Sequence, residues 1–431
     1  MKPVLQVALD LMHLQRAIAI AKDAVDGGAD WIEIGTPLIK SEGAEAVRAL
    51  RKAFPRQTLV ADMKTMDVGA FEVEIAVKAG ADIVTVMGLS DDGTISESVL
   101  AARKYGAQVM VDLMNSPDAL KRALDAEKLG ASYVCLHVGI DEQMKGHHSS
   151  IELVKEVSSA VSLPVAVAGG VNSTNASELV KAGAAIIVVG GAIIKAKDVK
   201  SATRLVKKAL ASRKALPSEL SRKYEGSDIA QALEKVSTPN IADAQHKRGV
   251  MTGILPRIKH NQKMVGRALT VQTAKGDWAK PVEAIDRAKE GDVIVIDAGG
   301  SDVAVWGELA SWSAQLKGVK GVVIDGAVRD IEGILEIEFP CFSKYVVPHA
   351  GEPKGHGGIG NEIACGGQLV RTGDWVIGDE NGVIVIPQEQ AVEVANRAVD
   401  VLERENRIRE EIKRGGTLSS VQELEKWEQV R

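Results

Sequence analysis

The sequence predicts an α/β protein, in which an N-terminal (β/α)8 barrel of the TIM type is followed by a smaller α/β domain. Over residues 1–210, apolar runs rich in β-branched residues alternate with amphipathic helical stretches about every 25 residues. There are eight such runs, the number that closes into a parallel barrel covered by helices. The runs are residues 4–10, 31–35, 58–64, 81–88, 107–114, 131–139, 163–170 and 184–191.

The composition is that of an ordinary globular protein, with 45% apolar and 26% charged residues among 431. Lys and Arg number 53 against 58 Asp and Glu, and the net charge of −5 argues against a nucleic-acid partner. The chain starts directly in a strand pattern, and it has no apolar stretch of 18 residues. We therefore expect a cytoplasmic protein that binds neither nucleic acid nor membrane.

The strand pattern ends after residue 210, and this sets the domain boundaries. We assign the barrel to residues 1–212, a linker to 213–226, a second domain to 227–390 and a helical tail to 391–431. In the second domain we expect a helix at 227–236, a loop at Thr238-Pro239-Asn240, and strands within 265–274, 292–300, 321–330 and 374–387. Their irregular spacing excludes a second barrel of the same type.

Polar side chains gather at the C-terminal ends of the predicted barrel strands, where enzymes of this fold carry their active sites. The residues are Asp10, Glu33, Asp62, Lys64, Asp112 and His137, and the glycine pairs Gly169-Gly170 and Gly190-Gly191 end the last two runs. Each residue alone is equally compatible with capping a helix or forming a tight turn. Their joint position at one rim favours a catalytic site.

The residue types at this rim indicate chemistry on a negatively charged intermediate. Glu33 and Asp62 are hard oxygen ligands on adjacent strands and suit one Mg²⁺ that also takes substrate oxygens. Lys64 lies two residues after Asp62, so both side chains should point into the barrel, where the ammonium can neutralise developing charge. His137 is the candidate for proton transfer, and Asp10 is counted among the catalytic residues.

The two glycine pairs predict a phosphate site. Gly169-Gly170 and Gly190-Gly191 let backbone N–H groups approach a phosphate closely at the ends of strands seven and eight. Combined with the metal, the lysine and the histidine, they suggest an enediolate of a sugar phosphate as the reacting species.

The run Asp62-Met63-Lys64-Thr65-Met66-Asp67 resembles the D-x-K-x-x-D signature of the orotidine 5′-phosphate decarboxylase superfamily. Residues 33–39, 137–146 and 166–171 resemble its 3-hexulose-6-phosphate synthase branch, so that the resemblance covers essentially residues 1–210.

This resemblance implies specific roles for the residues at the rim. Glu33 and Asp62 would hold Mg²⁺, Lys64 would face the enediolate and His137 would move the proton. The neighbourhoods of Gly170 and Gly191 would hold the phosphate. Asp67 would reach into the active site of a neighbouring subunit.

One position separates two branches of the superfamily. The 3-keto-L-gulonate-6-phosphate decarboxylase branch is expected to carry Arg two residues after the histidine, where this chain has Gly139. The resemblance therefore favours the aldol branch, whose aldehyde-lyases join formaldehyde to ribulose 5-phosphate or run in reverse. A decarboxylase that acts on a 3-keto sugar acid 6-phosphate is the alternative.

The second half contains one further candidate site. Arg329 and Asp330 end a predicted strand, and Gly307-Glu308-Leu309 opens a helix upstream. Arg329 can bind a small carboxylate and Asp330 a divalent metal, with N–H groups at the helix start completing the site. A structural Arg–Asp pair beside a glycine turn is the simpler alternative.

Residues 228–390 resemble the family of ribonuclease E activity regulators and 4-hydroxy-4-methyl-2-oxoglutarate aldolases. The matching pieces are residues 238–244, 307–311, 322–330 and 378–387. For the aldolase members, the resemblance implies a pyruvyl carboxylate and a metal on Arg329 and Asp330, and proton transfer by Glu308. These aldolases continue R-D-x-x-E/D, whereas Gly333 stands in the place of the last acid, for which the neighbouring Glu332 is the alternative. The alternative is a regulatory or assembly module without catalysis.

Both resemblances imply active sites shared between subunits, in dimers for the barrel and in trimers for the second half. We therefore expect a closed homo-oligomer, for example a hexamer, with a sugar phosphate and formaldehyde as small-molecule partners. The expected cofactors are Mg²⁺ in the barrel and a divalent metal in the second half.

Overall fold

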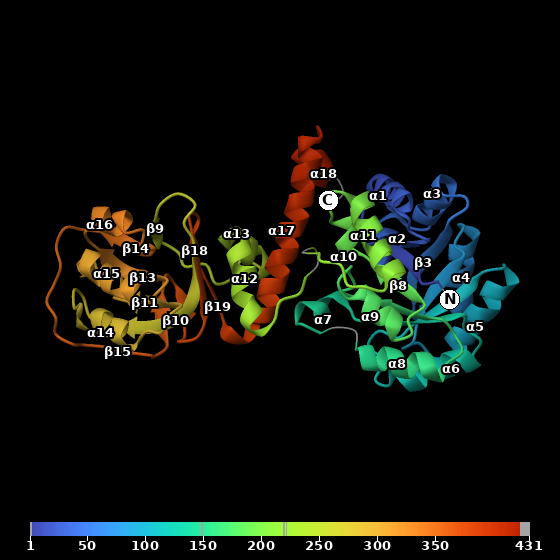
Figure 1. Cartoon of the computed structure of the whole chain (residues 1–431), viewed down its shortest axis with the longest axis horizontal. Helices are drawn as coiled ribbons and strands as arrows, with labels where there is room; N and C mark the ends of the chain where they lie inside the picture. The colour runs from blue at the N-terminus through green and yellow to red at the C-terminus, as the bar shows by residue number, and fades with distance from the viewer. Residues whose placement is uncertain (1, 148–149, 219, 221, 423–431) are drawn as a thin grey trace. The chain divides into compact units, whose positions relative to one another are not determined.

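The computed structural model describes residues 2–147, 150–218, 220 and 222–422 (Figure 1). The chain forms two compact units. The barrel unit comprises Met1–Lys223 together with Glu403–Arg431, and the second unit comprises Tyr224–Leu402. The second unit is therefore inserted, in sequence, between two pieces of the barrel unit.

Eight parallel strands close the barrel in sequence order, which confirms the predicted fold. The ring closes because β1 pairs in parallel with both β2 and β8. The strands are β1 Val4–Leu9, β2 Trp31–Ile34, β3 Thr58–Thr65, β4 Ile83–Met87, β5 Gln108–Asp112, β6 Tyr133–His137, β7 Val165–Ala168 and β8 Ile186–Val189.

Helices connect the barrel strands and cover the outside of the sheet. They are α1 Leu14–Gly27, α2 Thr36–Glu42, α3 Glu45–Ala53, α4 Gly69–Lys78, α5 Asp92–Lys104, α6 Ala119–Lys128, α7 Ile140–Met144, α8 Ile151–Ala160, α9 Ala176–Lys181, α10 Gly191–Ile194 and α11 Val199–Ser212. Several begin at an aspartate or serine whose side chain accepts a backbone N–H, as Asp91 does from Thr94 at the start of α5.

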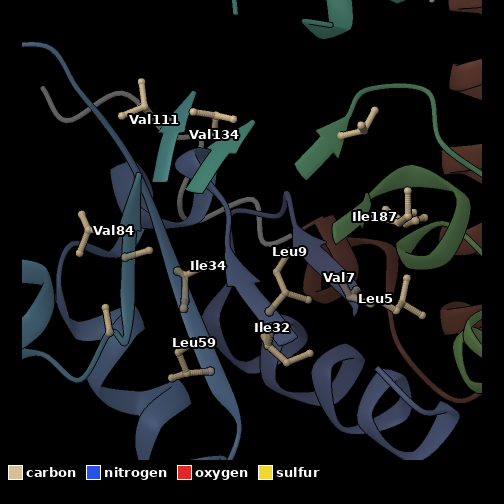
Figure 2. Packing of buried hydrophobic residues seen from close by; sticks show 14 of the residues in the cluster. Leu5, Val7, Leu9, Ile32, Ile34, Leu59, Val84, Val111, Val134 and Ile187 are labelled. Carbon is tan, nitrogen blue, oxygen red and sulfur yellow. The ribbon is translucent and has the colours of Figure 1, made fainter. Parts of the chain in front are cut away.

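Two apolar layers fill the barrel unit. Alternate strand residues such as Leu5, Val7 and Leu9 are fully buried between the sheet and the helices, as Figure 2 shows. The barrel interior holds a smaller cluster that includes Ala8, Val60 and Cys135. This cluster fills the barrel interior below the acids, lysine and histidine of the C-terminal rim.

An open mixed sheet forms the centre of the second unit, in the order β19-β18-β10-β11-β13-β14-β9, with β12 beside β13 and β15 beside β10. Neighbours among β10, β11, β13 and β14 run parallel, and β9, β18 and β19 are antiparallel to their neighbours. The strands are β9 Leu255–Arg257, β10 Met264–Gln272, β11 Asp292–Asp297, β12 Ala304–Trp306, β13 Gly321–Val328, β14 Cys341–Val346, β15 Gly358–Ile359, β18 Trp375–Asp379 and β19 Gly382–Ile386, and β16 Ile363–Cys365 and β17 Gln368–Val370 form a separate hairpin.

Helices and the hairpin cover the two faces of this sheet. Residues of α14 Ala279–Arg287, α15 Glu308–Leu316 and α16 Ile331–Glu336 pack on one face, and the β16–β17 hairpin packs on the other. A third cluster joins β18 and β19 to α12 Ile229–Lys235, α13 Thr238–Ala244 and the first turns of α17 Ala391–Lys413. Short 3-10 turns at Gly226–Asp228 and Gln388–Gln390 and the helix α18 Leu418–Gln422 complete the described elements.

The loop expected at Thr238-Pro239-Asn240 was a wrong prediction, because these residues form the first turn of α13. Proline is favoured in this turn, where its missing N–H has no helical acceptor to lose. Ser237 also caps the helix by accepting the backbone N–H of Asn240.

Among the helices that the structure describes, none has the length and apolar character needed to cross a bilayer.

Candidate active site

Lys64 joins two carboxylates at the rim of the barrel. Its Nζ lies 3.2 Å from Asp62 Oδ2 and 3.1 Å from Asp112 Oδ2. Burial alone would lower the pKa of Lys64, but Asp62 and Asp112 outweigh this effect and raise the pKa above its usual value. The side chain therefore stays an ammonium, fixed between two negative groups.

The backbone at Lys64 has an uncommon conformation, with φ at 48° in the left-handed region. The pairing of β3 with β4 shifts register between Ala61 and Thr65, so Lys64 lies in an irregular part of the strand. The Asp62–Lys64 contact thus forms through this irregularity, and not through the regular alternation that the sequence suggested.

Thr85 on β4 holds both members of this pair. Its hydroxyl donates to Asp62 Oδ1 at 2.7 Å and accepts the backbone N–H of Lys64 at 3.3 Å. Thr36 adds a second hydroxyl donor to Asp62, at 2.7 Å. Sequence analysis missed Thr85, because a β-branched residue inside an apolar strand carries no signal beyond its β-propensity.

Asp112 connects Lys64 to His137. The Nδ1 atom of His137 lies 2.8 Å from Asp112 Oδ2. Burial would raise the pKa of Asp112, but His137 and Lys64 lower it well below its usual range, so the carboxyl group stays ionised. An ionised carboxylate can only accept, so Nδ1 carries the proton and Nε2 is the basic nitrogen. The sequence placed Asp112 at the rim but gave it no role.

Glu33 is a buried acid on β2, only 8% exposed. Burial, together with the nearby charges of Asp62 and Asp10, raises the pKa of Glu33 well above its usual value. Gln6, which the sequence analysis also missed, donates its Nε2–H to Glu33 Oε2 at 2.5 Å. The other amide atom, Gln6 Oε1, is buried without a hydrogen-bond partner.

The residues predicted to hold Mg²⁺ fit that ion chemically. Two buried carboxylates, Glu33 and Asp62, repel each other at this rim, and a divalent cation would relieve the repulsion. No group of three or more His, Cys, Asp or Glu side chains suited to a metal occurs among the described residues. A two-carboxylate set suits Mg²⁺, which typically keeps waters and takes substrate oxygens for its other positions.

Asp10 and the glycine pairs lie at the same rim. A Cβ at Gly35 would come within 2.4 Å of Asp10 Oδ1, and one at Gly190 within 3.2 Å of Oδ2, so the carboxylate lies directly against these two glycines. Gly169 and Gly170 both have positive φ, at 97° and 67°. A side chain at Gly169 would also collide with the Val138 carbonyl oxygen, at 2.3 Å.

Asp67 is separate from this network. It is exposed, and its carboxylate accepts the backbone N–H of its neighbour Val68, at 2.7 Å. Large apolar side chains beside it are exposed as well, namely Met66, Val68 and Phe71 at 51%, 61% and 64%.

The candidate site of the second unit is more open. Arg329 Nε lies 3.4 Å from Asp330 Oδ2, and the two side chains are 45% and 44% exposed. Asp330 has φ at 59°, again in the left-handed region. Gly307 allows this arrangement, since a Cβ there would lie 2.6 Å from Asp330 Oδ2.

Glu308 and Leu309 have different positions at the start of α15. A Cβ at Gly333 would come within 2.6 Å of Glu308 Oε2, so the carboxyl group of Glu308 lies directly against Gly333. The structure thus brings Gly307, Glu308 and the Arg329–Asp330 pair together. Leu309 points away into solvent, with 82% of its surface exposed.

A closed parallel barrel with acids, a lysine and a histidine at its C-terminal rim defines a (β/α)8 enzyme. The orotidine 5′-phosphate decarboxylase / HUMPS family model matches residues 3–206, and the RraA-like (Aldolase/RraA) family model matches residues 238–385. The 3-hexulose-6-phosphate synthase of Mycobacterium gastri is 42% identical over 207 residues, which are 48% of this chain and 99% of the relative. Through its barrel, the chain belongs to the orotidine 5′-phosphate decarboxylase / HUMPS family, and it is a lyase-type enzyme.

Two solved structures are also similar to parts of the chain. The 3-keto-L-gulonate-6-phosphate decarboxylase of Vibrio cholerae is 25% identical, with 50% of this chain and 100% of that chain covered and a TM-score of 0.45. Streptomyces coelicolor RraAS2 is 25% identical, with 43% and 98% covered and a TM-score of 0.39.

Proposed function

We propose that the barrel is a Mg²⁺-dependent 3-hexulose-6-phosphate synthase of the cytoplasm, which joins formaldehyde to ribulose 5-phosphate or catalyses the reverse reaction. The observation that carries the proposal is the continuous chain from Lys64 through Asp112 to His137, which places a fixed ammonium beside an oriented base. The 42% identity to a synthase over 99% of that relative supports the choice of reaction.

In this mechanism His137 Nε2 removes a proton from C1 of the ketose phosphate, and the C–H electron pair gives the enediolate. The ammonium of Lys64 stabilises the negative charge that develops on the oxygens. C1 then attacks the carbon of formaldehyde, a C–C bond forms, and the imidazolium returns the proton to the former aldehyde oxygen. Asp112 keeps the imidazole in the required tautomer throughout. Mg²⁺ held by Glu33 and Asp62 would supply further positive charge beside the ketose oxygens.

The deciding experiment measures consumption of formaldehyde by the purified chain with ribulose 5-phosphate, with and without Mg²⁺. We expect metal-dependent consumption that Asp62→Ala abolishes. Release of CO₂ from a 3-keto sugar acid 6-phosphate, without formaldehyde consumption, would support the decarboxylase alternative.

Gly139 stands at the position that separates the two branches. A Cβ on Gly139 would lie 3.3 Å from the Met114 sulfur, so a larger side chain there would contact Met114.

We also propose that the barrel unit pairs with a second copy through the apolar surface around Asp67. Met66, Val68 and Phe71 are exposed there. Within the described part of the chain, Asp67 bonds to the backbone N–H of Val68 and not to the Lys64 network, which suits a residue that completes a neighbouring site. Light scattering should therefore give at least a dimeric mass, and Phe71→Asp should lower it. A monomeric mass for the unchanged protein rules the proposal out.

For the second unit we propose a small-carboxylate site at Arg329, with a divalent metal on Asp330 and proton transfer by Glu308. The convergence of these side chains around Gly307 and Gly333 supports a built site. A metal-dependent cleavage of 4-hydroxy-4-methyl-2-oxoglutarate that Arg329→Ala removes would support it. If neither the unchanged chain nor the variant cleaves this substrate, the proposed cleavage is wrong and the regulatory or assembly alternative is favoured.

A further inference from the structure

Gln6 places an amide inside the barrel, and the residue is only 1% exposed. It lies on β1 two residues before Ala8, which belongs to the apolar cluster of the barrel interior. Because side chains alternate along a strand, Gln6 points into the same interior. A leucine would fill this space without the cost of burying an amide, so the polar side chain indicates a specific partner.

The partner of Gln6 is Glu33. In the pairing of β1 with β2, Glu33 lies beside Ala8, so Gln6 is one side-chain layer deeper in the barrel than Glu33. From there, Gln6 Nε2 donates to Glu33 Oε2 at 2.5 Å. Both residues are buried, and a hydrogen bond to a carboxylate is stronger where water is excluded. Gln6 therefore fixes one of the two carboxylate oxygens of Glu33.

This bond limits how Glu33 can bind a cation. Since Oε2 accepts the amide N–H, an ion that took both oxygens of Glu33 would have to stretch or break a buried hydrogen bond. An ion that takes one oxygen leaves the bond intact. Glu33 is thus held as a ligand that offers a single oxygen.

Asp62, the other predicted metal ligand, is restricted in a similar way. Thr85 donates to its Oδ1 and Thr36 to its Oδ2, each at 2.7 Å. An ion bound by both oxygens of Asp62 would disturb at least one of these bonds. The two carboxylates together therefore favour an ion that takes one oxygen from each.

Mg²⁺ and Ca²⁺ differ in this respect. Mg²⁺ demands a near-ideal octahedron, keeps several waters and is usually bound by one or two carboxylates. Ca²⁺ takes six to eight oxygens in a flexible arrangement and readily accepts both oxygens of one carboxylate. The hydrogen bonds around Glu33 and Asp62 suit the smaller ion.

The other atom of the Gln6 amide supports the same conclusion. Gln6 Oε1 is buried and has no hydrogen-bond partner within the described part of the chain. It belongs to the amide that contacts Glu33, so it lies close to that carboxylate. A buried acceptor is costly unless it is paired, and a water that stays on the ion is a donor that could pair with it.

We propose that Gln6 is a positioning residue that favours Mg²⁺ over Ca²⁺ at Glu33 and Asp62, because it holds Glu33 as a ligand with one oxygen. The inference rests on the proposed function and deepens it by assigning the choice of metal to a residue inside the barrel. Gln6 acts through Glu33 and does not itself take part in the reaction.

Titration calorimetry on the full chain tests this role with two probes, Mg²⁺ and Ca²⁺, in the absence of substrate. Gln6→Met keeps the length of the side chain but cannot donate to Glu33. We expect Mg²⁺ binding to weaken by about tenfold or more, as is usual when the partner of a metal ligand is lost. Ca²⁺ binding should change much less, so the ratio of the two affinities falls.

Gln57→Met is the matched control. Gln57 is a half-buried glutamine directly before β3, where its Nε2 donates to the carbonyl groups of Ala29 and Asp30 at 3.0 and 2.5 Å. It lies at the opposite end of the barrel from the acids of the rim. This variant should bind both ions as the unchanged chain does.

A Gln6→Met variant that melts at the normal temperature and keeps the affinity ratio would overturn the proposal, whether both affinities are unchanged or both fall equally. Absence of Mg²⁺ binding by the unchanged chain would overturn it as well. If Gln6→Met does not fold, Gln6→Asn gives the same test, because the shorter side chain withdraws the amide from Glu33.

Failure of the proposed function gives a different pattern. If the affinity ratio depends on Gln6 but formaldehyde is not consumed, the positioning role is supported and the reaction is wrong. If formaldehyde is consumed with Mg²⁺ and Gln6→Met keeps the ratio, the reaction stands and the role of Gln6 fails.

Discussion

The barrel rim and the Arg329 site of the second unit place a non-glycine residue in the same left-handed conformation, but in very different surroundings. Lys64 has φ at 48° and a side chain that is 23% exposed between two carboxylates. Asp330 has φ at 59°, is 44% exposed and has one ion-pair contact, at 3.4 Å. Aspartate tolerates this conformation better than lysine does, so Lys64 is the more strained of the two.

This difference shows which site is organised in advance. A strained backbone persists only where its surroundings over-determine it, and Thr85, Asp62 and Asp112 do this for Lys64. The second site has fewer contacts of its own. The barrel rim is therefore held in place by contacts among its own side chains, whereas the Arg329–Asp330 pair is more exposed and has fewer fixed contacts.

The largest expected effect is the loss of activity in Lys64→Met. The variant keeps the length of the side chain but leaves Asp62 and Asp112 without their shared cation, so formaldehyde consumption should fall by roughly 10³-fold or more. Lys78→Met, at an exposed lysine on α4, is the matched control and should keep full activity. Activity within tenfold of the unchanged protein would mean that Lys64 is not the catalytic cation.

Thr85→Val tests whether the hydroxyl on β4 organises the rim. The change keeps the shape of the side chain but removes the donor to Asp62 and the acceptor for the Lys64 N–H, so kcat should fall by about 10- to 100-fold. Thr85→Ser restores the hydroxyl and should recover most of the rate. If valine and serine give the same kcat, the hydroxyl has only a structural role.

Asp112→Asn tests how strongly the barrel rim is stabilised, through the free energy of unfolding. Removing the charge of one partner of a buried ion pair should lower the free energy of unfolding by about 3 kcal/mol at pH 7, because Lys64 and His137 lose the negative charge that they share. The lowered pKa of Asp112 means that its stabilising effect is present above its ordinary value of 3.8 and is lost as the pH falls below that value. Urea unfolding of both proteins, measured from pH 7 to pH 3, should show that their difference in free energy of unfolding becomes smaller only near pH 3. If this difference does not change with pH, the ion pair at Asp112 is contradicted.

Asp330→Asn should have the smallest effect. A half-exposed pair at 3.4 Å contributes little in water, and asparagine also accepts the left-handed conformation, so the free energy of unfolding should change by less than about 0.5 kcal/mol. The same urea titration measures it. A loss comparable to that of Asp112→Asn would show that the second site is as firmly organised as the barrel rim.

The sequence was sufficient for the barrel, because each strand is a continuous apolar run that a parallel sheet buries on both faces. It was also sufficient for the charged rim residues, since strand ends are easy to locate. Thr85 and Gln6 could not be found in this way, because each lies inside a strand and matters only through a partner on another strand. The first turn of α13 was missed because Thr, Pro and Asn suit both turns and helix starts.

Helix α17 has a consequence for how the protein is made. Its last turns belong to the barrel unit, where Arg407 donates to the Ala196 carbonyl at 2.9 Å and Glu411 pairs with Arg16 at 3.0 Å. A ribosome adds about 5–20 residues each second, so the barrel strands emerge on the order of ten seconds or more before these partners exist. The nascent barrel therefore lacks the last turns of α17 until all of residues 224–402 have been synthesised. Translation, and not only packing, sets the order in which this unit is completed.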